Sequence, residues 1–156
     1  MSGREYFVYT DGSAKAGEGG PGGWGFHVRA PDGGEPREGW GKAIGTLAKA
    51  MEYRAVAEAL AALPDGASAL VFSDNMSLVE NMTKKLDVWR HNDFAKVDPV
   101  VVADVRRIAA LVVEKGLKLR WQWLKGHNGN AGNERADALA AQGAREAKSD
   151  LARGRR

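Results

Sequence analysis

Cysteine is absent from the 156 residues of this chain. Its absence excludes disulfide bonds, thiolate metal sites and cysteine nucleophiles, and it suits a reducing compartment. Long hydrophobic runs are also missing, since no apolar stretch approaches the roughly 20 residues that span a bilayer. The N-terminus, MSGREYFVYTDGS, lacks the basic and then apolar pattern of a secretory signal. We therefore expect a cytoplasmic protein without a membrane partner.

An excess of one charge is confined to the C-terminal end. The whole chain has a formal net charge of +3, and residues 145–156, with five basic and two acidic side chains, account for all of it. The body is neutral overall, so its global charge says little about a polyanionic partner. A chain of this length is expected to form one domain. We expect that domain over residues 1–148 and a basic, disordered tail over residues 149–156.

Hydrophobic periodicity predicts alternating strands and helices. Strands are expected at 6–9, 23–30, 38–43, 69–73 and 117–123, and helices at 47–63, 75–86, 99–116 and 133–148. We expect Thr46 to cap the first helix, Pro99 to open the third, and the stretch AKAGEGGPGGWG, which begins at Ala14, to form a flexible turn. The order β-β-β-α-β-α-α-β-α predicts an α/β fold with a mixed five-stranded sheet and helices on its faces.

Acidic side chains follow the strands that should lie side by side. Asp11 and Asp74 are each placed at the end of an apolar strand, Glu52 lies at the edge of a buried helix face, and Asp137 lies in the first turn of the last helix. Parallel strands bring such ends to one edge of a sheet. Each residue also has an ordinary structural explanation, because aspartate favours turns and helix N-termini. The joint pattern favours one acidic cluster.

Such a cluster needs a cation, because like charges at short range raise one another's pKa. Oxygen ligands without cysteine or histidine favour Mg²⁺ or Mn²⁺. Two such ions roughly 4 Å apart can activate a water and stabilise the leaving oxygen of a phosphodiester. His127, in the glycine-rich loop 126–132, has the type of side chain that shuttles protons near neutral pH.

A basic segment with interleaved aromatic residues covers residues 84–96. It contains Lys84, Lys85, Arg90, His91 and Lys96 around Trp89 and Phe94. Contacts of this kind to phosphates give affinity without reading sequence. The alternative is a solvated helix pair with a small hydrophobic anchor.

Taken together, these stretches resemble type 1 ribonuclease H, an endonuclease that cuts the RNA strand of RNA–DNA hybrids. The resemblance covers residues 4 to about 145, and it is carried by Thr10-Asp11-Gly12-Ser13, Met51-Glu52, Ser73-Asp74 and the stretch GHNGNAGNERAD at 126–137. It implies a ribonuclease H-like fold, with residues 1–148 as the catalytic domain and a hybrid as the partner of a monomer. The products would carry 5′-phosphate and 3′-hydroxyl ends.

The resemblance also implies roles for individual residues. Asp11, Glu52, Asp74 and Asp137 would ligate two Mg²⁺ ions, for which Mn²⁺ can substitute, and His127 would assist proton transfer and product release. The implied nucleic-acid contacts are Gly12, Ser13, Thr46, Lys49, Asn75, Met76, Lys84, Lys85, Trp89, Arg90, Asn92 and Phe94.

The chain departs from the family pattern before Glu52, where the stretch at 46–50 reads TLAKA and family members usually have polar residues. This change predicts weaker hybrid affinity or relaxed discrimination. Two other interpretations stay open: a binding module without catalysis, and a nuclease of the same superfold with another substrate, such as a DNA junction. The four acids favour an enzyme, and the His127 loop with the basic segment favours the hybrid.

Overall fold

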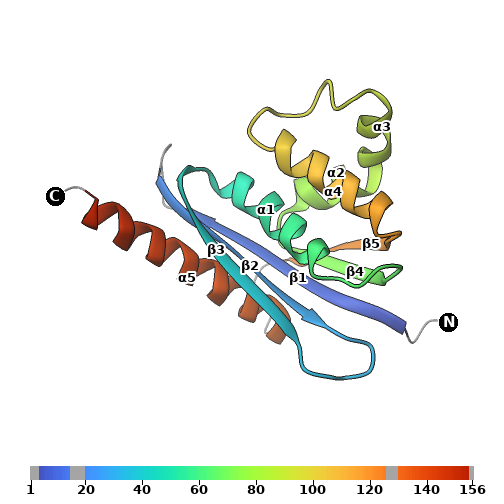
Figure 1. Ribbon diagram of the computed structural model, residues 1–156, viewed down its shortest axis with the longest axis horizontal. Coiled ribbons are helices and arrows are strands. Elements are labelled where there is room, and N and C mark those ends of the chain that lie inside the picture. Colours follow the sequence, from blue (N-terminus) through green and yellow to red (C-terminus); the bar gives the residue numbers. More distant parts are fainter. Residues whose placement is uncertain (1–3, 15–19, 126–129, 155–156) are drawn as a thin grey trace.

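A mixed five-stranded sheet organises the chain, for which the computed structural model describes residues 4–14, 20–125 and 130–154. The strands are β1 (Glu5–Ala14), β2 (Gly20–Arg29), β3 (Arg37–Thr46), β4 (Ser68–Ser73) and β5 (Lys118–Trp123). Their order in the sheet is β3-β2-β1-β4-β5 (Figure 1). β1, β2 and β3 pair in antiparallel fashion, and β4 is parallel to both β1 and β5. The predicted fold class is confirmed.

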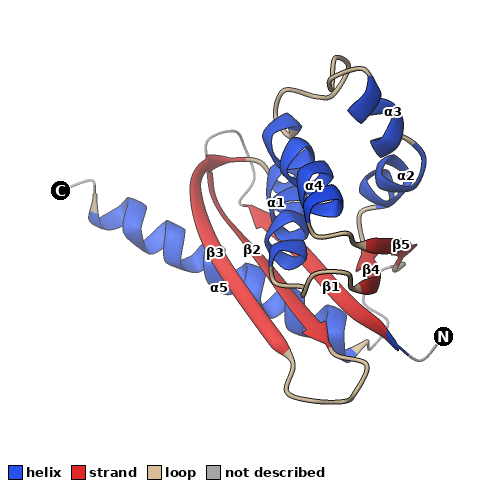
Figure 2. Ribbon diagram, turned by 45° about the vertical axis from the view of Figure 1, so that its right-hand side comes forward, coloured by secondary structure: helices blue, strands red, loops and turns tan. Residues whose placement is uncertain are grey.

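Helices cover both faces of this sheet (Figure 2). They are α1 (Ala48–Ala61), α2 (Met76–Lys84), α3 (Leu86–His91), α4 (Val102–Glu114) and α5 (Ala131–Arg153). α5 crosses one face, over β1, β2 and β3, while α1 packs on the other face and carries α4 on its outer side. The core between the sheet and α1 is aliphatic and fully buried, with Val8, Val56, Leu60, Val71 and Ile108 at its centre. No helix in the described part of the chain is long and apolar enough to cross a membrane.

Several predicted boundaries are wrong. Thr46 is the last residue of β3, where it pairs with Gly20, and Leu47 occupies the N-cap of α1 without a capping side chain. The predicted helix at 75–86 is interrupted at Lys85 and becomes α2 and α3. Pro99 does not open α4, because the preceding residues form a turn in which Val101 N–H donates to the Asp98 carbonyl at 3.0 Å.

The C-terminal boundary also differs from the prediction. Residues 149–153 continue α5 and are not disordered. Asp150 forms ion pairs with Arg153 on the same helix and with Lys42 on β3, which fixes this last turn against the sheet.

β2 begins at Gly20, three residues before the predicted strand and inside the stretch that was predicted to be a flexible turn. Farther along β2, α5 lies very close to two glycines that the predicted strand included. A Cβ at Gly23 would lie 2.4 Å from the carbonyl oxygen of Ala140, and one at Gly25 would lie 2.7 Å from that of Ala136. The fit is mutual, since a Cβ at Gly143 would lie 2.0 Å from the carbonyl oxygen of Gly41 on β3. The absence of side chains on both surfaces therefore sets the depth at which α5 packs.

We expect Gly143→Ala to lower the melting temperature. In a helix interior this change normally stabilises by about 1 kcal/mol. Here the new methyl group meets the backbone of β3, and overpacking costs about 1–3 kcal/mol, or roughly 2–4 °C per kcal/mol for a chain of this size. Thermal unfolding by circular dichroism measures the effect. Ser149→Ala, at an exposed position of α5, is the control and should change little. A higher melting temperature for Gly143→Ala would contradict this packing.

Candidate active site

Three carboxylates from separate elements meet at one edge of the sheet. Asp11 lies on β1, Glu52 on α1 and Asp74 immediately after β4, and each offers an oxygen within 4.8 Å of the other two. The parallel pairing of β1 and β4 ends at Tyr9 and Phe72, so Asp11 and Asp74 each lie two residues beyond it. The prediction that Asp11 lies at the end of its strand is wrong, because β1 continues to Ala14 in antiparallel pairing with β2.

The backbone around the site holds these side chains in place. Gly12 N–H donates to Glu52 Oε1 at 2.8 Å, and a Cβ at Gly12 would lie 2.4 Å from the Glu52 nitrogen. Glycine is therefore required where β1 passes under α1. On the other side, Trp123 Nε1–H donates to the Asp74 carbonyl at 3.2 Å, and Leu124 N–H donates to that of Ser73 at 2.9 Å. β5 thus holds the chain on both sides of the Asp74 α-carbon.

Burial and nearby negative charges raise the pKa values of two of the acids, Asp11 and Glu52. Burial raises the pKa of the Asp11 carboxyl to about 10, with further contributions from a hydrogen bond to Asp137 and from the nearby charges. Burial, and then the charge of Asp74, raise the pKa of the Glu52 carboxyl to about 8, although the Gly12 N–H opposes the shift. The carboxylates form an all-oxygen set of ligands, and their ionised forms repel one another. Such a set fits a hard divalent cation.

The fourth predicted acid lies at the margin of this group. Asp137, on α5, hydrogen-bonds with Asp11, but it is not one of the three carboxylates that lie within 4.8 Å of one another. α5 begins close to the sheet because Gly132 packs against the ring of Tyr9, where a Cβ would lie 2.4 Å from a ring carbon. Asn130 caps the helix by accepting from Asn133 N–H at 2.9 Å. His127 lies outside the described residues.

The residues predicted to contact nucleic acid fall into two groups. Lys84, Lys85, Arg90, Asn92 and Met76 are exposed, whereas Gly12, Ser13, Thr46, Asn75, Trp89 and Phe94 are partly or fully buried. Several of the polar side chains already have internal partners, among them Arg90, which pairs with Asp87 at 2.7 Å, and Lys84, which pairs with Glu80 at 3.9 Å. Asn75 caps α2 by accepting from Leu78 N–H at 3.0 Å, and Lys49, itself exposed, pairs with Asp98 at 2.5 Å. A phosphate contact from Lys49 would therefore compete with an existing ion pair.

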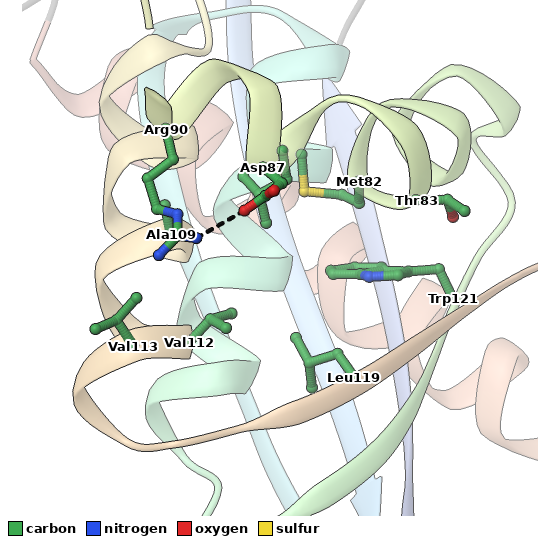
Figure 3. Close-up of a pocket in the computed structure, with 10 residues that line it drawn as sticks. Met82, Thr83, Asp87, Arg90, Ala109, Val112, Val113, Leu119 and Trp121 are labelled. Atoms are coloured by element: carbon green, nitrogen blue, oxygen red, sulfur yellow. Dashed lines mark hydrogen bonds and ion pairs between the residues drawn. The ribbon is translucent and has the colours of Figure 1, made fainter. Parts of the chain in front are cut away.

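A separate cavity of about 250 Å³ lies between α2, α3, α4 and β5 (Figure 3). Its lining is mostly apolar, with Leu119 and Trp121 of β5 facing Met82 of α2 and Val112 of α4. The acids of the cluster do not line it. The cavity is therefore distinct from the acidic cluster at the sheet edge.

Trp123 and Leu124 are site residues that sequence reasoning missed. Their alternating strand pattern predicts only a half-buried strand. The bond from the indole to the Asp74 carbonyl depends on the pairing of β4 with β5, in which Ser73 lies opposite Trp123. Only a prediction of the register between β4 and β5 would have placed Trp123 beside Asp74.

The fold and its acidic edge are those of ribonuclease H-like enzymes, and comparison with known proteins agrees. The RNase H family profile matches residues 3–145. A ribonuclease H of Polaromonas naphthalenivorans (strain CJ2) is 40% identical over 147 residues, which cover 92% of this chain and 89% of that protein. The chain therefore belongs to the ribonuclease H family.

Solved structures support the same assignment. LC9-RNase H1, described as a type 1 RNase H with the type 2 active-site motif, is 27% identical with a TM-score of 0.78, over 92% of this chain and 74% of its own. LC11-RNase H1, solved in complex with RNA/DNA hybrid, has the same fold, with a TM-score of 0.67 at 23% identity over 92% of this chain and 99% of its own. The predicted resemblance to type 1 ribonuclease H is confirmed.

We expect Asp11→Asn to stabilise the metal-free protein. Because the pKa values of Asp11 and Glu52 are raised in the folded state, from 3.8 to about 10 and from 4.5 to about 8, the folded protein binds more protons than the unfolded chain between these limits. Stability therefore falls as pH rises through this window. Asp11→Asn should melt at a higher temperature in EDTA at about pH 8, by about 2–4 °C per kcal/mol of relief.

The same substitution should reduce the loss of melting temperature between about pH 5 and about pH 8. Asp65→Asn, in an exposed turn, is the matched control and should leave the wild-type loss unchanged. If Asp11→Asn melts below the wild type in EDTA at both pH values, repulsion does not dominate this cluster.

Proposed function

We propose that this chain is an endonuclease that hydrolyses the RNA strand of RNA–DNA hybrids. The observation that carries the proposal is the convergence of Asp11, Glu52 and Asp74 on the fold of the ribonuclease H family. A relative of the same fold has been solved with a hybrid bound. A binding module without catalysis has no need of buried acids that repel one another, so the raised pKa values favour an enzyme.

In this proposal Asp11, Glu52, Asp74 and Asp137 hold two Mg²⁺ ions, and Mn²⁺ can replace them. When bound, the ions would activate a water and stabilise the leaving oxygen of the phosphodiester. The chain's own groups orient the ligands: the Gly12 N–H holds the Glu52 carboxylate, and Trp123 fixes the backbone of Asp74. His127 would transfer a proton and assist release of products with 5′-phosphate and 3′-hydroxyl ends.

The substrate would lie across the acidic edge and reach the basic segment 84–96. The exposed cations Lys84, Lys85 and Arg90 would contact phosphates of the DNA strand. Selection of a hybrid would rest on groove shape and 2′-hydroxyl groups, as expected for A-form helices. All four acids come from one chain, so a monomer would suffice. We place the activity in the cytoplasm, where hybrids and Mg²⁺ occur together.

A cleavage assay tests the function directly. In Mg²⁺ the wild type should cut the RNA strand of a labelled hybrid, and Asp11→Asn should cut it more than about a hundredfold more slowly, since even outer-shell partners of metal ligands are worth 10–100-fold. The exposed substitution Asp65→Asn is the control. RNA–RNA and DNA–DNA duplexes in parallel reveal how strict the substrate preference is. Inactivity of the wild type in both Mg²⁺ and Mn²⁺ would refute the proposed function.

The proposal assigns different tasks to Asp137 and His127, which two variants can separate. Asp137→Asn should weaken Mg²⁺ binding, measured by calorimetry, and slow turnover with it. His127→Ala should slow turnover by about 10²–10⁴-fold, the usual contribution of a general acid–base group, with Mg²⁺ affinity nearly unchanged. An equal loss of Mg²⁺ affinity in both variants would contradict this assignment.

A further inference from the structure

We propose that Arg106 is a positioning residue that holds the corner at Asp93 and Phe94 in the conformation in which the basic segment 84–96 binds a hybrid. This inference rests on the function proposed above. It adds a residue on α4, outside both the acidic edge and the basic segment, to the machinery for substrate binding.

The corner has an unfavourable backbone. Asp93 and Phe94 have φ values of 56° and 61°, the two positive values found for non-glycine residues in the described part of the chain. Aspartate tolerates this region, but a bulky residue such as phenylalanine rarely adopts it. A strained corner persists only where surrounding contacts determine it, and such corners are common at ligand-binding sites.

Arg106 makes three contacts with this corner. Its Nη1 donates to Asp93 Oδ1 at 3.1 Å, its Nη2 donates to the Asp93 carbonyl at 3.2 Å, and its guanidinium carbon lies 4.8 Å from the centre of the Phe94 ring. An exposed ion pair alone contributes little. The planar guanidinium instead fixes a side chain, a carbonyl and a ring together, which the point charge of a lysine cannot do.

Three side chains of the segment, Leu86, Trp89 and Phe94, pack against the hydrophobic core but stay only partly buried. None of the six residues of α3, all of them described, is buried. The cavity of about 250 Å³ lies beneath α3, and Figure 3 shows Asp87 and Arg90 on one side of it and Val112 and Val113 of α4 on the other. The position of the segment therefore depends strongly on the contacts that follow α3.

A second ion pair fixes the chain a few residues further on. Asp98 pairs with Lys49 at 2.5 Å, on the helix that carries Glu52 one turn later. Between the two pairs, the exposed Lys96 is presented on a short, restrained stretch, and the exposed Asn92 directly precedes that stretch. A surface ordered in advance saves the entropy of ordering it on binding. The charge of Arg106 is already paired with that of Asp93. We therefore expect Arg106 to raise the affinity for a hybrid by holding the corner in place, and not by contacting a phosphate.

Arg106 and Asp93 carry opposite charges, so substitutions of the two residues separate an effect of charge from an effect of the corner. Asp93→Ala removes a negative charge beside the proposed path of the substrate, so simple electrostatics predicts tighter binding, whereas loss of the side-chain contact that holds the corner predicts weaker binding. Arg107→Ala is the matched control, because Arg107 is the next residue of α4, similarly exposed, and pairs with Glu58 at 2.8 Å. Arg106→Lys keeps the charge without the planar group.

Steady-state cleavage of a labelled hybrid in Mg²⁺ gives KM and kcat, and fluorescence anisotropy gives the Kd in an Asp11→Asn background. Both Arg106→Ala and Asp93→Ala should raise KM and Kd by about three- to tenfold, with kcat within about twofold. Arg106→Lys should be intermediate and Arg107→Ala close to wild type. The double variant should match Arg106→Ala, because that change already removes the ion pair with the Asp93 side chain.

Tighter binding by Asp93→Ala, or equal losses in Arg106→Ala and Arg107→Ala, would overturn the proposal. A wild type that cuts hybrids while every variant matches it would also overturn it and would leave the proposed function standing. A wild type that neither cuts nor binds a hybrid would instead refute the proposed function.

Discussion

Repulsion among three clustered carboxylates, one buried and two half-buried, is the constraint on which this structure depends. Asp11 is only 4% exposed, and oxygens of Glu52 and Asp74 lie within 4.8 Å of its own. Left to relax, such side chains would move apart or stay protonated, as the raised pKa values of Asp11 and Glu52 indicate. The scaffold has to hold them in spite of this cost, and it does so mainly with backbone groups. A site that is unfavourable without a cation is well prepared to bind one.

The scaffold that does this is rigid because its layers are closely packed. Gly23 and Gly25 let α5 approach the sheet on one face, and Gly12 lets α1 approach on the other. Each contact places a side chain of the site: α5 brings Asp137, and α1 brings Glu52. Glycine in a strand is usually a weakness. Here it allows two helices to deliver carboxylates to the same edge from opposite faces.

Sequence reasoning predicted the fold class and the meeting of four acids, of which three lie within 4.8 Å of one another, because both follow from local patterns. Apolar strands ending near Asp11 and Asp74, and the helical stripe that includes Met51, are visible in the chain itself. Gly20 and Gly22 were predicted to lie in a turn because glycine has low strand propensity, and their place in β2 depends on pairing with β1 and β3. The end of α5 was misread because its last turn is held by Lys42 of β3.

The finer parts of the site were beyond the sequence for the same reason. The bonds from Trp123 to Asp74 and from Arg106 to Asp93 join residues 49 and 13 positions apart. Such partners are set by sheet register and helix packing, for which a single chain gives no local pattern. The pairing of Lys49 with Asp98 also changes how Lys49 should be read, from a free phosphate ligand to a brace between α1 and the loop before α4.

The parallel register of β1 and β4 has a consequence for how the protein tolerates insertions. Side chains alternate faces along a strand, so adding one residue before Asp11 or before Asp74 would turn that carboxylate to the opposite side of the sheet. Loops elsewhere can lengthen at small cost. The number of residues from Tyr9 to Asp11 and from Phe72 to Asp74 is therefore fixed. The length of these spans, more than their composition, decides whether the acids meet.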